Sequence, residues 1–186
     1  MLNSKLKNTH TLSKRLLELE VFTFLDAIQF IKNLPYGRTK DRANPDLVLE
    51  ELKGTCSTKH AVIKKLAIEL NLEQVKLYLC LFKMSTSNTP KLASVLLNYN
   101  LKYIPEAHCV LKIEGDFIDV TNATSSYKTI KKDVLHLVEI QPNQIGDFKV
   151  NYHKEYLKGW LETEKKASSF EDFWQIREQC IAVLSQ

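Results

Sequence analysis

Gly54-Thr55-Cys56 places a thiol at the start of a predicted helix. Gly54 ends one short helix, and apolar or buried-type residues then recur at steps of four and three, at Cys56, His60, Ile63, Ala67 and Leu70. This spacing predicts a helix whose apolar stripe faces the protein. The first turn of a helix carries unpaired N–H groups and a partial positive charge, which lower the pKa of a thiol below about 8.5. The sequence therefore predicts Cys56 as an activated thiolate, with a cysteine that only fills space as the alternative.

Three short motifs carry reactive side chains in a fixed order along the chain. Gly54-Thr55-Cys56 opens a helix, His108-Cys109-Val110 opens an expected strand, and Asp119-Val120-Thr121 lies on the next strand. In this order and context the motifs resemble those of the transglutaminase-like superfamily, whose core is similar to that of papain-like cysteine proteases. The resemblance covers about residues 46–121. It implies that Cys56 is a nucleophile, that His108 is its acid and base, and that Asp119 orients the histidine.

The chemistry expected of these three residues is acyl transfer. The Cys56 thiolate would attack a carbonyl carbon and form an acyl-thioester. His108 would hand a proton to the leaving amine, because an imidazole exchanges protons near neutral pH. Asp119 would fix the tautomer of His108 and favour its charged form. The N–H group of Cys56 could stabilise the oxyanion, and a second donor is expected from the upstream loop, from Tyr36, Arg38 or Asn44.

The expected hairpin between the two strands leaves the third member of the triad open. A two-residue turn at Gly115-Asp116 would set Lys112 opposite Asp119. Asp119 would then share a face with His108 but lie four residues away, about 13 Å, unless a bulge changes the register. A three-residue turn would place Asn122 opposite His108 instead. Asn122 is therefore the reserve candidate, whereas the family motif favours Asp119.

A zinc site is a further alternative, because His60 follows Cys56 at Cys-x-x-x-His spacing. Only His108 and Asp119 could complete the ligand set, so a hydrogen-bonded core histidine, or a residue lining the site, is the favoured interpretation of His60. The other cysteines show no paired spacing and are expected as free thiols. Cys80 and Cys109 are expected in the core. Asp116 is expected in the turn rather than in catalysis.

The order of predicted elements indicates an α+β fold. Helices are expected over 12–31 (one or two), 44–54, 56–70, 90–97, 148–161 and 170–184, and strands over 75–82, 108–113, 117–120 and 134–140. The expected architecture is a Cys-bearing central helix packed on an antiparallel sheet, with flanking N- and C-terminal helices. We expect a single domain over residues 1–186, with a papain- or transglutaminase-like core at about 44–141 and a helical extension at 142–186. The aromatic residues of this extension are expected to anchor packing; they are Trp160, Phe170, Phe173 and Trp174.

Composition excludes several classes of function. The 186 residues are 44% hydrophobic and 26% charged, with a net charge of +4, which is typical of a soluble globular domain. The sequence shows no membrane-spanning run, no layout of a signal peptide and no nucleic-acid-binding fingerprint. We therefore expect a cytoplasmic protein that binds neither membrane nor nucleic acid, has no cofactor or metal, and takes a protein or peptide as substrate.

Three functional hypotheses follow from these observations. The first is a thiol-dependent acyl hydrolase or transferase acting on amide bonds, such as a peptidase, an amidase or a transglutaminase-like enzyme. Hydrolysis is preferred, because water needs no dedicated acceptor site. The second is a non-catalytic binding module that keeps a relict site. The third is a metalloprotein that uses Cys56, His60 and His108.

Overall fold

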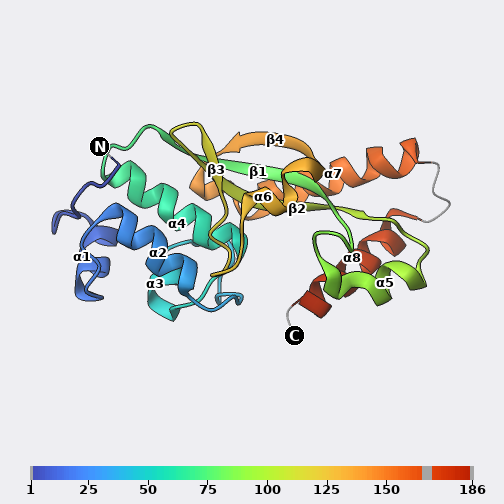
Figure 1. Cartoon of the computed structure of the whole chain (residues 1–186), viewed down its shortest axis with the longest axis horizontal. Helices are drawn as coiled ribbons and strands as arrows, with labels where there is room; N and C mark the ends of the chain where they lie inside the picture. The colour runs from blue at the N-terminus through green and yellow to red at the C-terminus, as the bar shows by residue number, and fades with distance from the viewer. Residues whose placement is uncertain (1, 165–168, 185–186) are drawn as a thin grey trace.

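Four antiparallel strands form the sheet at the centre of the molecule, in the part of the chain that the structure describes (Figure 1). The structure is a computed structural model that describes residues 2–164 and 169–184. The sheet has the order β3-β2-β1-β4 and consists of β1 (Val75–Met84), β2 (Ile104–Ile113), β3 (Asp116–Ile118) and β4 (Val134–Ile140). The fold is α+β, as the order of elements along the sequence predicts.

The N-terminal helices gather at one end of the elongated molecule, where α1, α2 and α3 contact α4 (Figure 1). They are α1 (Thr11–Glu18), α2 (Phe24–Asn33), α3 (Leu47–Glu51) and α4 (Cys56–Glu69). Glu20, with φ at 60°, lies in the break between α1 and α2, so the stretch 12–31 forms two helices. Leu52 is also left-handed and is 41% exposed. Consequently α3 ends at Glu51, earlier than the expected end at Gly54.

The C-terminal helices lie mostly at the other end of the molecule, with η1 (Pro90–Leu92) and α5 (Ala93–Asn98). α7 (Asp147–Thr163) contacts β2 and α8 (Phe170–Leu184). The Trp160 ring packs on Phe173, with centroids 5.1 Å apart, so these aromatic residues anchor the packing as expected. The extension is helical over most of its described part, and its residues 165–168 and 185–186 lie outside the described residues.

The two faces of the sheet carry two separate hydrophobic clusters. One cluster joins α1, α2 and α4 to the odd-numbered residues of β1 and includes Cys109. The other joins α5, α7 and α8 to the even-numbered residues of β1 and includes Cys80. This division follows from the alternation of side chains along a strand. Both cysteines are fully buried, which confirms their expected place in the core.

The β2–β3 hairpin differs from its expected form by one residue. Its two-residue turn is Glu114-Gly115, with φ at 50° and 100°, and the ladder pairs Lys112 with Phe117. Positive φ at both central residues is typical of a type I′ turn, which suits the twist of a hairpin. The expected pairing of Lys112 with Asp119 is therefore wrong. Asp116 begins β3 instead of occupying the turn.

Several other element boundaries differ from the sequence-based expectation. β2 begins at Ile104, so His108 lies in the middle of a strand instead of at its start. The short helices α6 (Tyr127–Ile130), η2 (Lys131–Asp133) and η3 (Pro142–Gln144) were not expected. β4 and α8 have their expected bounds. Among the described helices, each is too short or too polar to cross a membrane.

Candidate active site

Cys56 is the first residue of α4, and the local sequence explains why the helix begins there. The Thr55 hydroxyl accepts from the N–H of Thr58, and the Thr58 hydroxyl accepts from the N–H of Thr55, which forms a capping box. Gly54 allows a close approach, because a Cβ at this position would lie 2.9 Å from Cγ of Lys59. The thiol thus stands at the positive end of a capped helix.

The upstream loop crosses directly beside this helix start. The N–H of Gly54 donates to the carbonyl of Pro35, and the N–H of Gly37 donates to the carbonyl of Gly54. These two bonds form a parallel bridge between Tyr36 and Gly54. Of the three expected sources of a second oxyanion donor, Tyr36 is therefore held next to the helix that begins at Cys56.

Asn44 is occupied elsewhere. Its side-chain oxygen accepts from the N–H of Asp46 before α3. Asn44 also lines a cavity of about 490 Å³ with Asp41 and Lys65, and none of Cys56, His108 and Asp119 lines it. Asn44 is thus a structural residue at the start of a helix.

His108 and Asp119 meet across the hairpin. Nε2 of His108 lies 2.8 Å from Oδ2 of Asp119. Since Leu111 pairs with Ile118, the same register continued would set His108 opposite Thr121. Asp119 is only two residues from that position and shares its face of the sheet. The expected offset of four residues is therefore wrong, and no bulge is needed.

Asp119 is held rigidly behind the imidazole, and Asn122 is not part of the arrangement. Oδ1 of Asp119 accepts from the N–H and the hydroxyl of Thr121, at 2.9 and 2.6 Å. The Asn122 side-chain oxygen accepts from Thr124 and Ser125 instead. Asp119 is 8% exposed and His108 only partly exposed, so their interaction is shielded from water.

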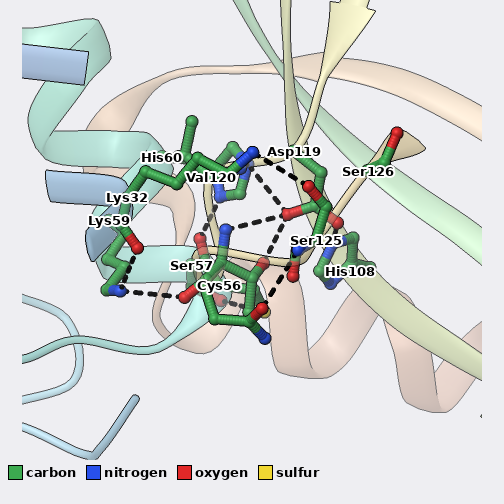
Figure 2. Close-up of polar contacts among 12 residues, drawn as sticks. Lys32, Cys56, Ser57, Lys59, His60, His108, Asp119, Val120, Ser125 and Ser126 are labelled. Atoms are coloured by element: carbon green, nitrogen blue, oxygen red, sulfur yellow. Dashed lines mark hydrogen bonds and ion pairs between the residues drawn. The ribbon is translucent and has the colours of Figure 1, made fainter. Parts of the chain in front are cut away.

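Figure 2 shows Cys56, His108 and Asp119 gathered where the start of α4 meets the chain after β3. Burial disfavours the thiolate, but the charges of Lys149 and His108 and hydrogen bonds from His108 and Ser57 lower the pKa of Cys56 to about 6. Burial also opposes the imidazolium, yet the charges of Asp119 and Cys56 raise the pKa of His108 well above its usual value. Since Nε2 faces Asp119, Nδ1 is the nitrogen left for Cys56. These pKa shifts favour a thiolate at Cys56 and an imidazolium at His108 near neutral pH, with the Asp119 carboxylate on the other side of the ring.

Asp119 keeps its negative charge despite being buried. Burial raises the pKa of the Asp119 carboxyl, but the charge and hydrogen bond of His108, followed by His60, hold that pKa well below its usual range. A carboxylate in this position can fix a tautomer and stabilise a positive imidazole.

Two polar side chains reach this region from distant helices. Nζ of Lys149, in the first turn of α7, donates to Oγ of Ser57 at 2.8 Å, and that oxygen lies 3.8 Å from Sγ of Cys56. On β2, the Glu106 carboxylate receives two hydrogen bonds from the Arg177 guanidinium of α8. Desolvation and then the negative charges of Cys56 and Glu106 raise the pKa of Tyr36. The site thus draws on the upstream loop, α4, β2, α7 and α8.

His60 is the hydrogen-bonded core histidine that the sequence favours. It is fully buried. Its Nε2 accepts from the N–H of Val120 at 3.0 Å, so Nδ1 carries the proton and donates to the carbonyl of Cys56 at 2.6 Å. Burial lowers the pKa of His60 to about 4, which keeps the ring neutral. The ring ties the first turn of α4 to the segment that bears Asp119.

Lys59 makes a second tie between the same segments. Its ammonium is buried and donates to the carbonyls of Lys32, Leu34 and Thr121 (Figure 2). A buried charge is tolerated when its hydrogen bonds are satisfied. Lys59 and His60 together hold the two halves of the site in register.

The zinc alternative finds no ligand set in the described residues. No group of three or more His, Cys, Asp or Glu side chains there is placed to hold a metal ion. Both ring nitrogens of His60 are already engaged by backbone groups. His60 therefore has no free lone pair to offer a metal.

Sequence reasoning missed the contributions of Ser57, Glu106, Lys149 and Arg177. Glu106 lies two residues before His108 on the same strand, so alternation along the strand was a signal that could have found it. Ser57 adjoins Cys56. For Lys149 and Arg177, which come from the C-terminal helices, no local pattern indicates a place in the site.

Comparisons of the chain with protein-family models, with curated proteins and with solved structures find no match.

Proposed function

We propose that this protein is a thiol-dependent acyl hydrolase or transferase that acts on amide bonds of a protein or peptide substrate. The observation that carries the proposal is the 2.8 Å contact between His108 and Asp119, beside a Cys56 thiol whose pKa the charges of Lys149 and His108 lower. The motif resemblance to the transglutaminase-like superfamily supports the same chemistry. We infer that Cys56 is the nucleophile, His108 the acid and base, and Asp119 the orienting carboxylate.

In the first half of the proposed reaction, the Cys56 thiolate attacks the amide carbonyl carbon and a C–S bond forms. The oxygen takes the negative charge close to the N–H groups at the start of α4. The C–N bond then breaks, and His108 gives its Nδ1 proton to the leaving amine. The products of this half are the free amine and an acyl-thioester on Cys56.

In the second half, His108 removes a proton from water, whose oxygen attacks the thioester carbonyl. The C–S bond breaks, the acid is released and the thiolate returns. An amine acceptor would complete a transfer by the same steps. We prefer hydrolysis, because water requires no further binding site.

The buried charges favour an enzyme over a binding module with a relict site. Partly buried charges cost stability even when paired, and Cys56, His108 and Asp119 carry three of them side by side. A module that only binds a partner gains nothing from a charged thiolate. The paired charges are therefore better explained by a reaction than by recognition alone.

A small activated ester tests the proposal without knowledge of the natural substrate. With p-nitrophenyl acetate, we expect a burst of about one nitrophenolate per chain and an acetyl group on Cys56, detected by mass spectrometry of peptides. The Cys56→Ala variant should lose both signals, and His108→Gln should slow them strongly. Acylation of the wild-type protein no faster than that of free cysteine would rule out the enzyme.

A further inference from the structure

The position of Lys149 in α7 is not explained by the helix that carries it. Lys149 lies in the first turn of α7, where the helix dipole disfavours a cation. Its side chain reaches residue 57 in the first turn of α4, 92 residues away along the chain. Lys149 is therefore held by the site and not by its own helix.

Two successive contacts lead from the Lys149 ammonium through the Ser57 hydroxyl to the Cys56 sulfur. A protonated lysine can only donate, so Oγ of Ser57 accepts from Nζ at 2.8 Å. The hydroxyl hydrogen of Ser57 is then free to point at Sγ of Cys56, 3.8 Å away. A thiolate accepts such a bond better than a thiol does, because charged acceptors make the stronger hydrogen bonds.

The other charged groups around Lys149 leave it available for this role. The groups that act on its ammonium are Cys56, Cys109, Glu106 and Arg177, and burial opposes its charge. Both oxygens of Glu106 are already occupied by Arg177. His153, also on α7, is near enough to be affected by Lys149, but burial lowers the pKa of His153, so this ring does not compete as a cation.

We propose that Lys149, acting through Ser57, holds Cys56 in its thiolate form independently of His108. This inference rests on the proposed function, because it gives a positioning role to a residue around the same nucleophile. Two cations then face the sulfur, one from β2 and one from α7. Cys56 then stays a thiolate when His108 loses its proton. His108 can therefore release and take up protons as acid and base while Cys56 remains unprotonated.

The test is the pH dependence of Cys56 alkylation by iodoacetamide, followed by mass spectrometry of the Cys56 peptide. In the wild-type protein the rate should rise with a midpoint near pH 6, as the pKa of Cys56 is about 6. In Lys149→Met the midpoint should rise by about one unit, so that the rate near that pH falls about fivefold, while the plateau at high pH is unchanged. Lys149→Arg keeps the charge and should restore most of the shift.

Four further variants make the result specific. Ser57→Ala removes the hydroxyl but not the charge, so its midpoint should rise by a smaller amount, and it serves if Lys149→Met fails to fold. His108→Gln should keep a midpoint below about 8.5, and the double variant with Lys149→Met should lose this remaining shift. Lys158→Met is the matched control on α7, since Lys158 pairs with Glu155 on the surface.

Two outcomes would overturn the inference, and they differ from a failure of the proposed function. A wild-type midpoint near pH 6 that is unchanged in both Lys149→Met and Ser57→Ala would show that His108 alone holds the thiolate. His108→Gln titrating like a free thiol would show the same. If the wild-type protein itself titrates like a free thiol, the proposed function fails together with the inference.

Discussion

Replacing Asp119 by asparagine changes one atom of the site and reverses the hydrogen bond to His108. Oδ1 of Asp119 accepts twice from Thr121, and the amide oxygen of the Asp119→Asn variant would keep those bonds. The new amide nitrogen would then face Nε2 of His108, which lies 2.8 Å from Oδ2 in the native site. Because that nitrogen donates, Nε2 must become an acceptor and the ring proton must move to Nδ1. The imidazolium loses its charged partner, and the neutral ring is held in the opposite tautomer.

The size of the effect follows from the charge that is lost. Removing an opposite charge at hydrogen-bond distance lowers the pKa of a histidine by roughly two units, or about 2.7 kcal/mol between the charged and neutral forms. If the transition state for acylation needs the imidazolium, this free energy corresponds to about a 100-fold lower rate. The backbone is expected to stay in place, since Thr121 remains bonded.

The measurement is acylation by the amide p-nitroacetanilide, whose leaving amine needs the His108 proton, with the thermal unfolding midpoint as a check on folding. Asp116→Asn is the matched control, because Asp116 is exposed at the start of β3 only three residues upstream. We expect the control to react as the wild-type protein does. Folded Asp119→Asn protein that reacts within about threefold of the wild-type rate, a difference of less than about 1 kcal/mol, would refute the orienting role of the carboxylate.

Two further predictions concern the buried groups that align the site. Because burial lowers the pKa of His60 from 6.5 to about 4, His60 binds a proton in the unfolded chain but not in the folded chain between these two pH values. The wild-type protein should therefore lose up to about 3 kcal/mol of stability as the pH falls through this range. His60→Gln should lack this contribution in urea unfolding, whereas a difference from wild type that is constant with pH would contradict it. Lys59→Met leaves three carbonyls without the donor that Lys59 provides and should lower the free energy of unfolding by about 3 kcal/mol. Lys64→Met removes one hydrogen bond and should cost clearly less. Equal losses in the two variants would contradict the role of Lys59 in holding the two segments together.

Most helices and strands of the fold could be predicted from local patterns in the sequence. The apolar periodicity of α4 and α8 and the β-forming residues of β1 and β4 determine these elements within each segment, so they could be predicted. The end of α3 and the hairpin turn could not, because both depend on which residue takes a left-handed conformation. Leu52 and Glu114 do so here, although their residue types give no such signal.

The candidate site divides in the same way. Cys56, His108 and Asp119 stand in short motifs, so a resemblance could single them out, and the structure places the three together. The distance between His108 and Asp119 could not be predicted, because a shift of one residue in the turn moves every cross-strand pair. Lys149 reaches Ser57 only through the packing of α7 against the sheet. Contacts of this kind depend on tertiary structure and cannot be predicted from a local pattern.

The central claim is that Cys56 is a thiolate at neutral pH, and its ultraviolet absorbance tests this most directly. Cys56→Ala is subtracted from the wild-type protein across a pH titration. The other cysteines contribute little in this range, since burial raises the pKa of Cys80 and Cys180 to about 11 and also raises that of Cys109. We expect a difference signal for one thiolate with a midpoint of about 6. A signal that appears only near the ordinary thiol pKa of about 8.5 would contradict the claim.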